Sequence, residues 1–136
     1  MIVVDASLFA AWLLNESRPG PEDALWDRLA AETLIVPSHW PNEIANALRR
    51  AVQMKRLRAD EIEPVAERIR PFDVNLVPPT AIDDIGRLAS DALSNDLSAY
   101  DMLYVRLAKE RQLPLATVDR AMRAAAQHLK IAVLPA

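Results

Sequence analysis

The chain has no cysteine and only two glycines among its 136 residues. The absence of cysteine excludes disulfide bonds, thiolate zinc sites and cysteine nucleophiles, and it fits the reducing cytoplasm. Neither of the glycine-rich loops that hold nucleotide phosphates, GxGxxG and GxxxxGK[ST], is present. No apolar run approaches the ~20 residues that a membrane-spanning helix needs. No basic segment precedes the first apolar residues, as it would in a secretory signal. We therefore expect a cytoplasmic protein without a membrane segment.

The chain also has no net positive charge, because 19 acidic residues outnumber 16 basic ones and the formal net charge is −3. This balance argues mildly against a protein that coats nucleic acid by electrostatics alone. The objection is weak, since acidic residues committed to metal ions would no longer count against it. With 51% hydrophobic and 26% charged residues, the composition is that of a globular protein. The length predicts a single domain over residues 1–136.

Short apolar runs alternate with amphipathic segments along the chain. The runs predict strands, which we expect at 2–4, 34–36, 74–77, 115–116 and 131–134. The amphipathic segments predict helices, which we expect at 7–15, 22–32, 41–56, 60–70, 81–93, 99–112 and 120–128. Apolar runs without alternation are typical of strands covered on both faces. The pattern therefore predicts a three-layer α/β fold with a parallel sheet and right-handed crossovers.

Four acidic residues stand where strands end or helices begin. Asp5 follows the first expected strand, and Asp119 comes two residues after Thr117, beyond the fourth strand. Glu43 lies in the first turns of the helix after the second strand, and Asp101 lies in the first turn of a later helix. Ligands of parallel α/β sheets collect beyond the carboxyl ends of the strands. The four positions therefore form a candidate site.

Each acid also has a purely structural explanation. Asp5 and Asp119 are plausible helix N-caps, which stabilise a helix by ~1 kcal/mol each. Ser98 and Asp101 resemble a capping box, and Glu43 could complement the dipole of its helix. Taken one at a time, these structural explanations are favoured over a functional one.

The conjunction of the four acids reverses that preference. Converging carboxylates without partners raise one another's pKa values. Divalent cations relieve this repulsion, and oxygen ligands without cysteine favour Mg²⁺ or Mn²⁺. A divalent cation held there would activate a bound water as a nucleophile. His39 and His128 are too few and too scattered to form a histidine pair for acid–base catalysis.

Four segments together resemble the PIN-domain ribonucleases, specifically VapC-type toxins of bacterial toxin–antitoxin modules. The segments are IVVDASLFAAWLL, VPSHWPNEIANALRRA, LSAYDMLYVRLAKERQLPLATVDRAM and IAVL, and they occur in that order across nearly the whole chain. By position, the acidic residues of the family fall on Asp5, Glu43, Asp101 and Asp119, with Ser7 and Thr117 as supporting polar residues.

The resemblance implies a PIN-like α/β/α sandwich with a five-stranded parallel sheet of order 3-2-1-4-5 and about seven helices. It also implies Mg²⁺- or Mn²⁺-dependent cleavage of RNA to products with 5′-phosphate and 3′-hydroxyl ends. A homodimer and a cognate VapB-type antitoxin that blocks the acidic site are implied as well. Two positions depart from the pattern: Met102 stands where alanine is common, and Asp96 is an extra acid that we expect to be solvated.

Two other classes of function stay open. One is a PIN-like binding module that holds a partner without cleaving it, and the other is a different divalent-metal phosphoesterase. The presence of all four acids argues against a pure binding module. Asp5-Ala6-Ser7 lacks the Asp-x-Asp motif of haloacid-dehalogenase phosphatases.

Several basic and aromatic residues could serve partners. The basic run Arg49–Arg58 could follow phosphates, with a solvated helix end as the equal alternative. The three tryptophans, at 12, 26 and 40, could stack on bases, although core positions are more common for them. A groove for an antitoxin helix is expected at a set of apolar side chains that could instead fill the core: Trp12, Leu13, Trp26, Leu48 and Val52.

Overall fold

The computed structural model describes residues 1–14 and 22–136. The end of the first expected helix, at Asn15, lies outside the described residues. Five strands form one parallel sheet of order β3-β2-β1-β4-β5, as predicted. They are β1 (Ile2–Val4), β2 (Leu34–Val36), β3 (Val74–Leu76), β4 (Leu115–Ala116) and β5 (Val133–Leu134).

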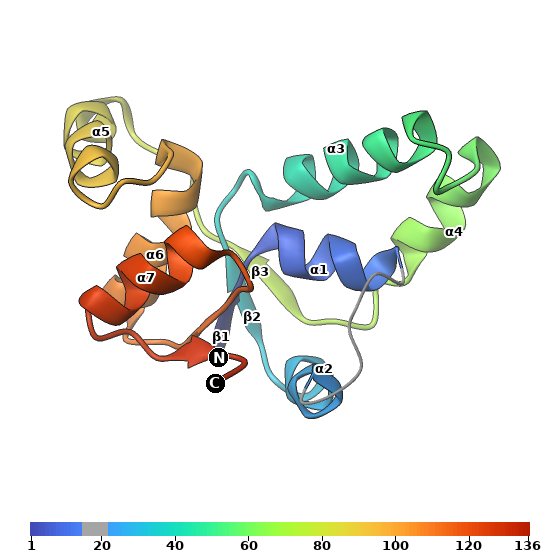
Figure 1. Ribbon diagram of the computed structural model, residues 1–136, viewed down its shortest axis with the longest axis horizontal. Helices are drawn as coiled ribbons and strands as arrows, with labels where there is room; N and C mark the ends of the chain where they lie inside the picture. The colour runs from blue at the N-terminus through green and yellow to red at the C-terminus, as the bar shows by residue number, and fades with distance from the viewer. Residues whose placement is uncertain (15–21) are drawn as a thin grey trace.

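Seven α-helices are present among the described residues. They are α1 (Ala6–Leu13), α2 (Glu22–Ala31), α3 (Trp40–Gln53), α4 (Ile62–Glu67), α5 (Ile85–Ser94), α6 (Ala99–Arg111) and α7 (Arg120–His128). Figure 1 shows α1, α3 and α4 on one side of the sheet and α6 and α7 on the other, which gives the predicted three layers. No helix in the described ranges is long and apolar enough to cross a membrane.

Two of the expected helices begin as 3₁₀ turns. Residues Ala59–Glu61 precede α4, and Ile82–Asp84 precede α5. The Arg58 backbone N–H donates to Glu61 at 3.0 Å, which holds the first of these turns. The helical patterns at 60–70 and 81–93 are therefore correct in kind, but each is divided by a tighter first turn.

The central strands and their covering helices form the core. All three residues of β1 and both of β4 are completely buried, because layers of helices cover both faces of the sheet. The register pairs Val3 with Ile35 on one side and with Leu115 on the other. This register brings the ends of β1 and β4 level with each other, so the residues that follow them meet at one edge.

The aromatic residues are gathered around Phe9 on α1. The Phe9 ring meets Trp12, Trp26, Trp40 and Phe72 edge-on at centroid distances of 4.9–5.5 Å. Trp40 is only 3% exposed, so it cannot stack on a base of a bound nucleic acid. Trp12 and Trp26 are half-buried and stack on each other at 4.8 Å.

The expected antitoxin groove needs correction. Leu13 and Leu48 are 1% and 4% exposed and belong to the core, so they cannot contact a partner. The two residues belong to the core cluster, and the helices that carry them, α1 and α3, pack against each other. Only Trp12, Trp26 and Val52 of the expected set keep part of their surface.

Candidate active site

Asp5 and Asp119 follow the adjacent strands β1 and β4. The helix after β1 covers one face of the sheet and the helix after β4 covers the other, so this is the switch point where α/β sheets bind ligands. The Asp5 backbone N–H donates to the Ala116 carbonyl at 3.0 Å, which extends the β1–β4 ladder to the site. The sheet register therefore fixes the relative position of these two acids.

Asp5 is almost completely buried, at 1% exposure. Its carboxylate accepts hydrogen bonds from the Ser7 backbone N–H at 3.2 Å and the Thr117 hydroxyl at 2.9 Å. Burial raises the pKa of Asp5 from 3.8 to about 6, and the charges of Glu43 and Asp101 add to that rise. The N-cap expected for Asp5 is present, but it does not account for a buried acid that is paired with no cation among the described residues.

Thr117 connects two of the acids. Its hydroxyl donates to Asp5 and accepts a hydrogen bond from the Asp119 backbone N–H at 3.1 Å. The Asp119 carboxylate caps α7 by accepting from the Met122 backbone N–H at 2.9 Å. Ser7, in contrast, contributes its backbone N–H here, and its side chain is exposed.

Glu43 reaches the site from α3. Its Oε1 accepts a hydrogen bond from the Tyr104 hydroxyl at 2.9 Å and lies 2.8 Å from His39 Nε2. The Glu43 side chain is one-third exposed, at 33%. Ile44, Leu48 and Ala51 of the same helix are buried, so Glu43 lies at the flank of the buried face, as its helical position predicts.

Asp101 lies in the first turn of α6. The Ser98 hydroxyl accepts from the Asp101 backbone N–H at 3.1 Å, which is the serine half of the expected capping box. Among the described residues, Asp101 forms no reciprocal hydrogen bond to the Ser98 backbone N–H. Burial raises the pKa of Asp101, as do the charges of Asp119 and Glu43. Asp101 is therefore close enough to Asp5, Glu43 and Asp119 to interact electrostatically with each of them.

The acids are not arranged as a finished metal site. In the part of the chain that the structure describes, no three His, Asp or Glu side chains lie close enough together to hold a metal ion. Asp5, Glu43 and Asp119 each turn instead toward hydrogen-bond donors of the protein itself. Binding a cation would require at least some of these side chains to turn.

Sequence reasoning missed Tyr104 and His39, which both contact Glu43. The signal for Tyr104 was its spacing, because it follows Asp101 by three residues on α6 and so shares a helical face with it. His39 precedes Glu43 by four residues, and the same rule brings their side chains together. The two departures from the family pattern, Asp96 and Met102, stay apart from these contacts. Asp96 is exposed, as expected, and Met102 is buried in the core.

The sequence profile of the PIN domain matches residues 2–127. The chain belongs to the PIN-domain family. It is 36% identical over 120 residues to VapC ribonuclease Mb0985 of Mycobacterium bovis and to ribonuclease VapC9 of Mycobacterium tuberculosis. These alignments cover 88% of this chain and 86% of each relative. These matches confirm the prediction that the chain is a PIN domain of the VapC type.

Two solved structures share the fold of this PIN domain. PAE2754 from Pyrobaculum aerophilum superposes with a TM-score of 0.69 at 24% identity, covering 97% of this chain and 81% of that one. FitAcB from Neisseria gonorrhoeae gives a TM-score of 0.63 at 21% identity, covering 98% and 96% of the two chains. At these identities the likeness concerns the fold, and it confirms the predicted PIN-like architecture.

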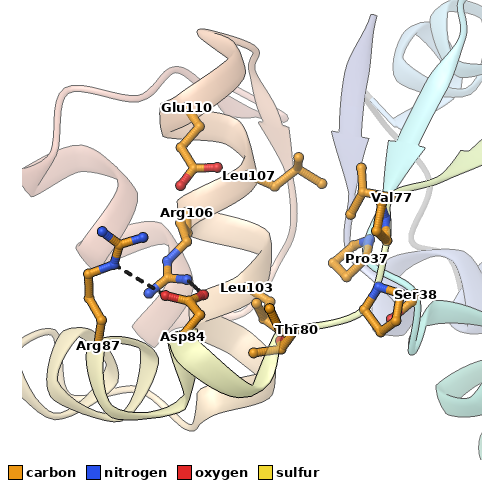
Figure 2. A pocket seen from close by; sticks show the side chains of 13 residues that line it. Pro37, Ser38, Val77, Thr80, Asp84, Arg87, Leu103, Arg106, Leu107 and Glu110 are labelled. Carbon is orange, nitrogen blue, oxygen red and sulfur yellow. Dashed lines mark hydrogen bonds and ion pairs between the residues drawn. The ribbon is translucent and has the colours of Figure 1, made fainter.

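A separate pocket of about 390 Å³ lies outside the acidic site. Its walls come from the segments after β2 and β3 and from α6, and include Pro37, Thr80, Leu103 and Arg106. Figure 2 shows Asp84 and Arg87 along its rim, with Asp84 linked to both Arg87 and Arg106. None of the four candidate acids lines this pocket.

Proposed function

We propose that this PIN domain, taken as a single domain over residues 1–136, is a ribonuclease toxin whose cleavage depends on Mg²⁺ or Mn²⁺. One observation carries the proposal: a buried Asp5, paired with no cation of the described chain, whose pKa is raised further by Glu43 and Asp101. An arrangement that costs stability without a ligand is typical of functional sites. The ribonuclease names of the mycobacterial relatives support the choice of substrate.

The residues present fit a divalent metal by their chemistry. All four acids offer carboxylate oxygens, the ligands that Mg²⁺ and Mn²⁺ prefer. Asp5 and Asp101 would hold the ion, with Glu43 and Asp119 binding directly or through water. The bound metal would supply the positive charge that activates water and offsets charge on the scissile phosphate.

The remaining polar residues hold these acids in position. Thr117 and the Ser7 backbone N–H orient the Asp5 carboxylate, and Thr117 also fixes the start of α7 beneath Asp119. Ser98 fixes the first turn of α6, which carries Asp101. We expect single-stranded or looped RNA as substrate, since its backbone can approach a recessed site. Products with 5′-phosphate and 3′-hydroxyl ends are expected from the family.

The direct test is cleavage of total RNA by the purified protein, with new 5′ ends mapped by sequencing. Activity should be lost in EDTA and return with Mg²⁺ or Mn²⁺. Equal cleavage in EDTA would contradict the metal mechanism.

The separation of the carboxylates favours one second candidate, a binding module that does not cleave. In that case the protein would bind RNA or a partner, with no new 5′ ends at any metal concentration. The cleavage assay distinguishes the two functions.

A VapB-type antitoxin is the expected partner. The acidic site without metal suits an arginine, whose planar group can satisfy two carboxylate oxygens at once. A groove of about 200 Å³ between α1 and α3 starts at Ser7, beside Asp5, and has Ala10, Leu14 and Ala47 among its lining residues. An antitoxin helix with small apolar contacts would fit there. Co-expression with the neighbouring upstream reading frame should yield a complex that no longer cleaves RNA.

A homodimer is also proposed, and α5 provides its most exposed apolar surface. Ile82, Ile85 and Leu93 are 82%, 56% and 84% exposed, and their spacing places them along one side of this segment. A second copy would cover them. Light scattering should show a dimer for the wild type and a monomer for Leu93→Glu; a wild-type monomer would contradict the proposal.

A further inference from the structure

Tyr104 is completely buried, yet it carries a polar hydroxyl that must find partners. The hydroxyl donates to Glu43 Oε1 at 2.9 Å and accepts a hydrogen bond from the Ala6 backbone N–H at 3.4 Å. Ala6 directly follows Asp5, and Tyr104 lies three residues after Asp101. One hydroxyl therefore links the chain segments of three acidic residues.

The second contact to Glu43 falls on the same oxygen. His39 Nε2 lies 2.8 Å from Glu43 Oε1, and the His39 and Tyr104 rings meet edge-on at 5.3 Å. Oε2 makes no hydrogen bond or ion pair with any described residue. The two oxygens of Glu43 are thus unequal: one is held by the protein and the other is available.

The Tyr104 hydroxyl is the donor in its contact with Glu43, because an ionised carboxylate oxygen can only accept a hydrogen bond. The oxygen of Glu43 that it contacts is therefore occupied.

We propose that Tyr104 is a positioning residue of the acidic site: its hydroxyl holds Oε1 of Glu43, beside His39, so that Glu43 offers Oε2 alone to a divalent cation. On the other side of the site, the Thr117 hydroxyl donates to Oδ2 of Asp5 and accepts a hydrogen bond from the Asp119 backbone N–H. This inference rests on the proposed function, because it concerns how the same site takes its metal. Groups that orient metal ligands in this way change metal affinity by about 10–100-fold when they are removed.

The test is Mn²⁺ binding to the RNA-free protein, measured by calorimetry for the wild type and Tyr104→Phe. The substitution removes the hydroxyl and keeps the ring, and we expect the Kd for Mn²⁺ to rise about 10-fold or more. The matched control is Tyr100→Phe on the same helix. The Tyr100 ring also meets the His39 ring edge-on, at a centroid distance of 5.4 Å. Tyr100 is 65% exposed, however, and its hydroxyl makes no hydrogen bond to a carboxylate of the described residues. Its Kd should not change.

A double-mutant cycle separates positioning from a general effect on folding. In a Glu43→Ala background, the loss of the Tyr104 hydroxyl should change the Kd for Mn²⁺ by less than twofold, because its target is gone. An equal effect in both backgrounds would overturn the inference, as would a Tyr104→Phe protein that binds Mn²⁺ like the wild type. If Tyr104→Phe did not fold, Glu43→Gln would replace it, and Mn²⁺ binding as tight as in the wild type would overturn the inference.

Failure of the proposed function has a different outcome. A wild-type protein that binds no Mn²⁺, or cleaves RNA fully in EDTA, would overturn the metal-dependent function together with this inference. Loss of Mn²⁺ binding in Asp5→Asn but not in Tyr104→Phe would overturn the inference alone.

Discussion

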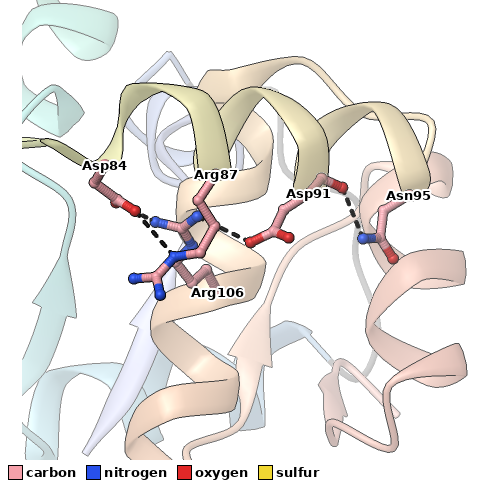
Figure 3. A network of polar contacts seen from close by, with 5 residues as sticks. All are labelled: Asp84, Arg87, Asp91, Asn95 and Arg106. Atoms are coloured by element: carbon pink, nitrogen blue, oxygen red, sulfur yellow. Dashed lines mark hydrogen bonds and ion pairs between the residues drawn. The ribbon is translucent and has the colours of Figure 1, made fainter.

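The acids at the ends of β1 and β4 and the acids of the α5 region stand in opposite electrostatic situations. Asp84 and Asp91 both bind the guanidinium of Arg106, which is 13% exposed, and Asp84 also pairs with Arg87 at 3.2 Å (Figure 3). The hydrogen bond from Arg106 lowers the pKa of Asp84, with a smaller contribution from Arg87. Asp5 has no such cation among the described residues, and its pKa is raised to about 6.

This difference separates acids whose charges are satisfied within the chain from acids that, under the proposed function, bind a metal ion. The Asp84–Arg106–Asp91 contacts attach α5 to α6, so their charges are satisfied within the chain. The charge of Asp5 is balanced only by hydrogen bonds, and its neighbours are also acidic. An external cation would stabilise the protein through Asp5 and its acidic neighbours. It would leave the Asp84–Arg106–Asp91 contacts unchanged.

The largest expected effect is on catalysis. Asp5→Asn should lower RNA cleavage by more than about 100-fold, because the charge that holds the metal is gone. Loss of a group that only orients a metal ligand costs less, about 10–100-fold. Asp84→Asn should leave cleavage unchanged and lower the stability, since Arg106 loses a partner. Initial rates with a labelled RNA, together with thermal unfolding, check both variants. Similar cleavage by the two variants would remove the distinction between the two groups of acids.

The second effect is on the pH dependence of stability without metal. The raised pKa of Asp5 means that the folded state binds a proton more tightly than the unfolded state, whose pKa is near 3.8. The stabilisation is present below pH 4 and is lost as the pH rises through about 6, an effect of about 2 kcal/mol between pH 4 and 7. Asp101 adds in the same direction. Urea unfolding in EDTA should show this slope in the wild type and a flatter one in Asp5→Asn; equal slopes would contradict it.

The third effect concerns the ion pairs of α5. Arg106→Ala should lower the free energy of unfolding by about 1–3 kcal/mol, because two carboxylates lose their shared partner and the buried stem of the arginine is removed. Arg87→Ala, at an exposed position, is the control and should change it by no more than about 1 kcal/mol. Denaturant unfolding measures both. Equal losses of unfolding free energy in the two variants would show that the buried position of Arg106 adds nothing to the stability.

The smallest effect tests the structural role of Asp101. Ser98→Ala should cost about 1 kcal/mol through loss of the N-cap of α6. Asp101→Asn keeps the backbone N–H that Ser98 accepts from, so it should keep that stability and still lose metal-dependent cleavage. Full cleavage by Asp101→Asn would remove Asp101 from the proposed metal site.

Much of the fold was readable from local patterns. Unbroken apolar runs predicted the buried strands, and the family resemblance predicted the order 3-2-1-4-5, which the structure shows. The weaker points were helix starts, where Ala59–Glu61 and Ile82–Asp84 form 3₁₀ turns, and surface grooves. Leu13 and Leu48 were expected at a partner surface, but both are part of the buried core, and the helices that carry them pack against each other.

The sequence by itself determined which residues stand at strand ends and helix starts, and with them the four candidate acids. That information is local, because a strand, a cap and a helical turn are each set by residues a few positions apart. Only the tertiary structure decided which donors meet those acids: Thr117 is 112 residues from Asp5, and Tyr104 is 61 residues from Glu43. Such contacts arise when the sheet register and the packing of α6 bring distant segments together, and one sequence carries no local signal for them.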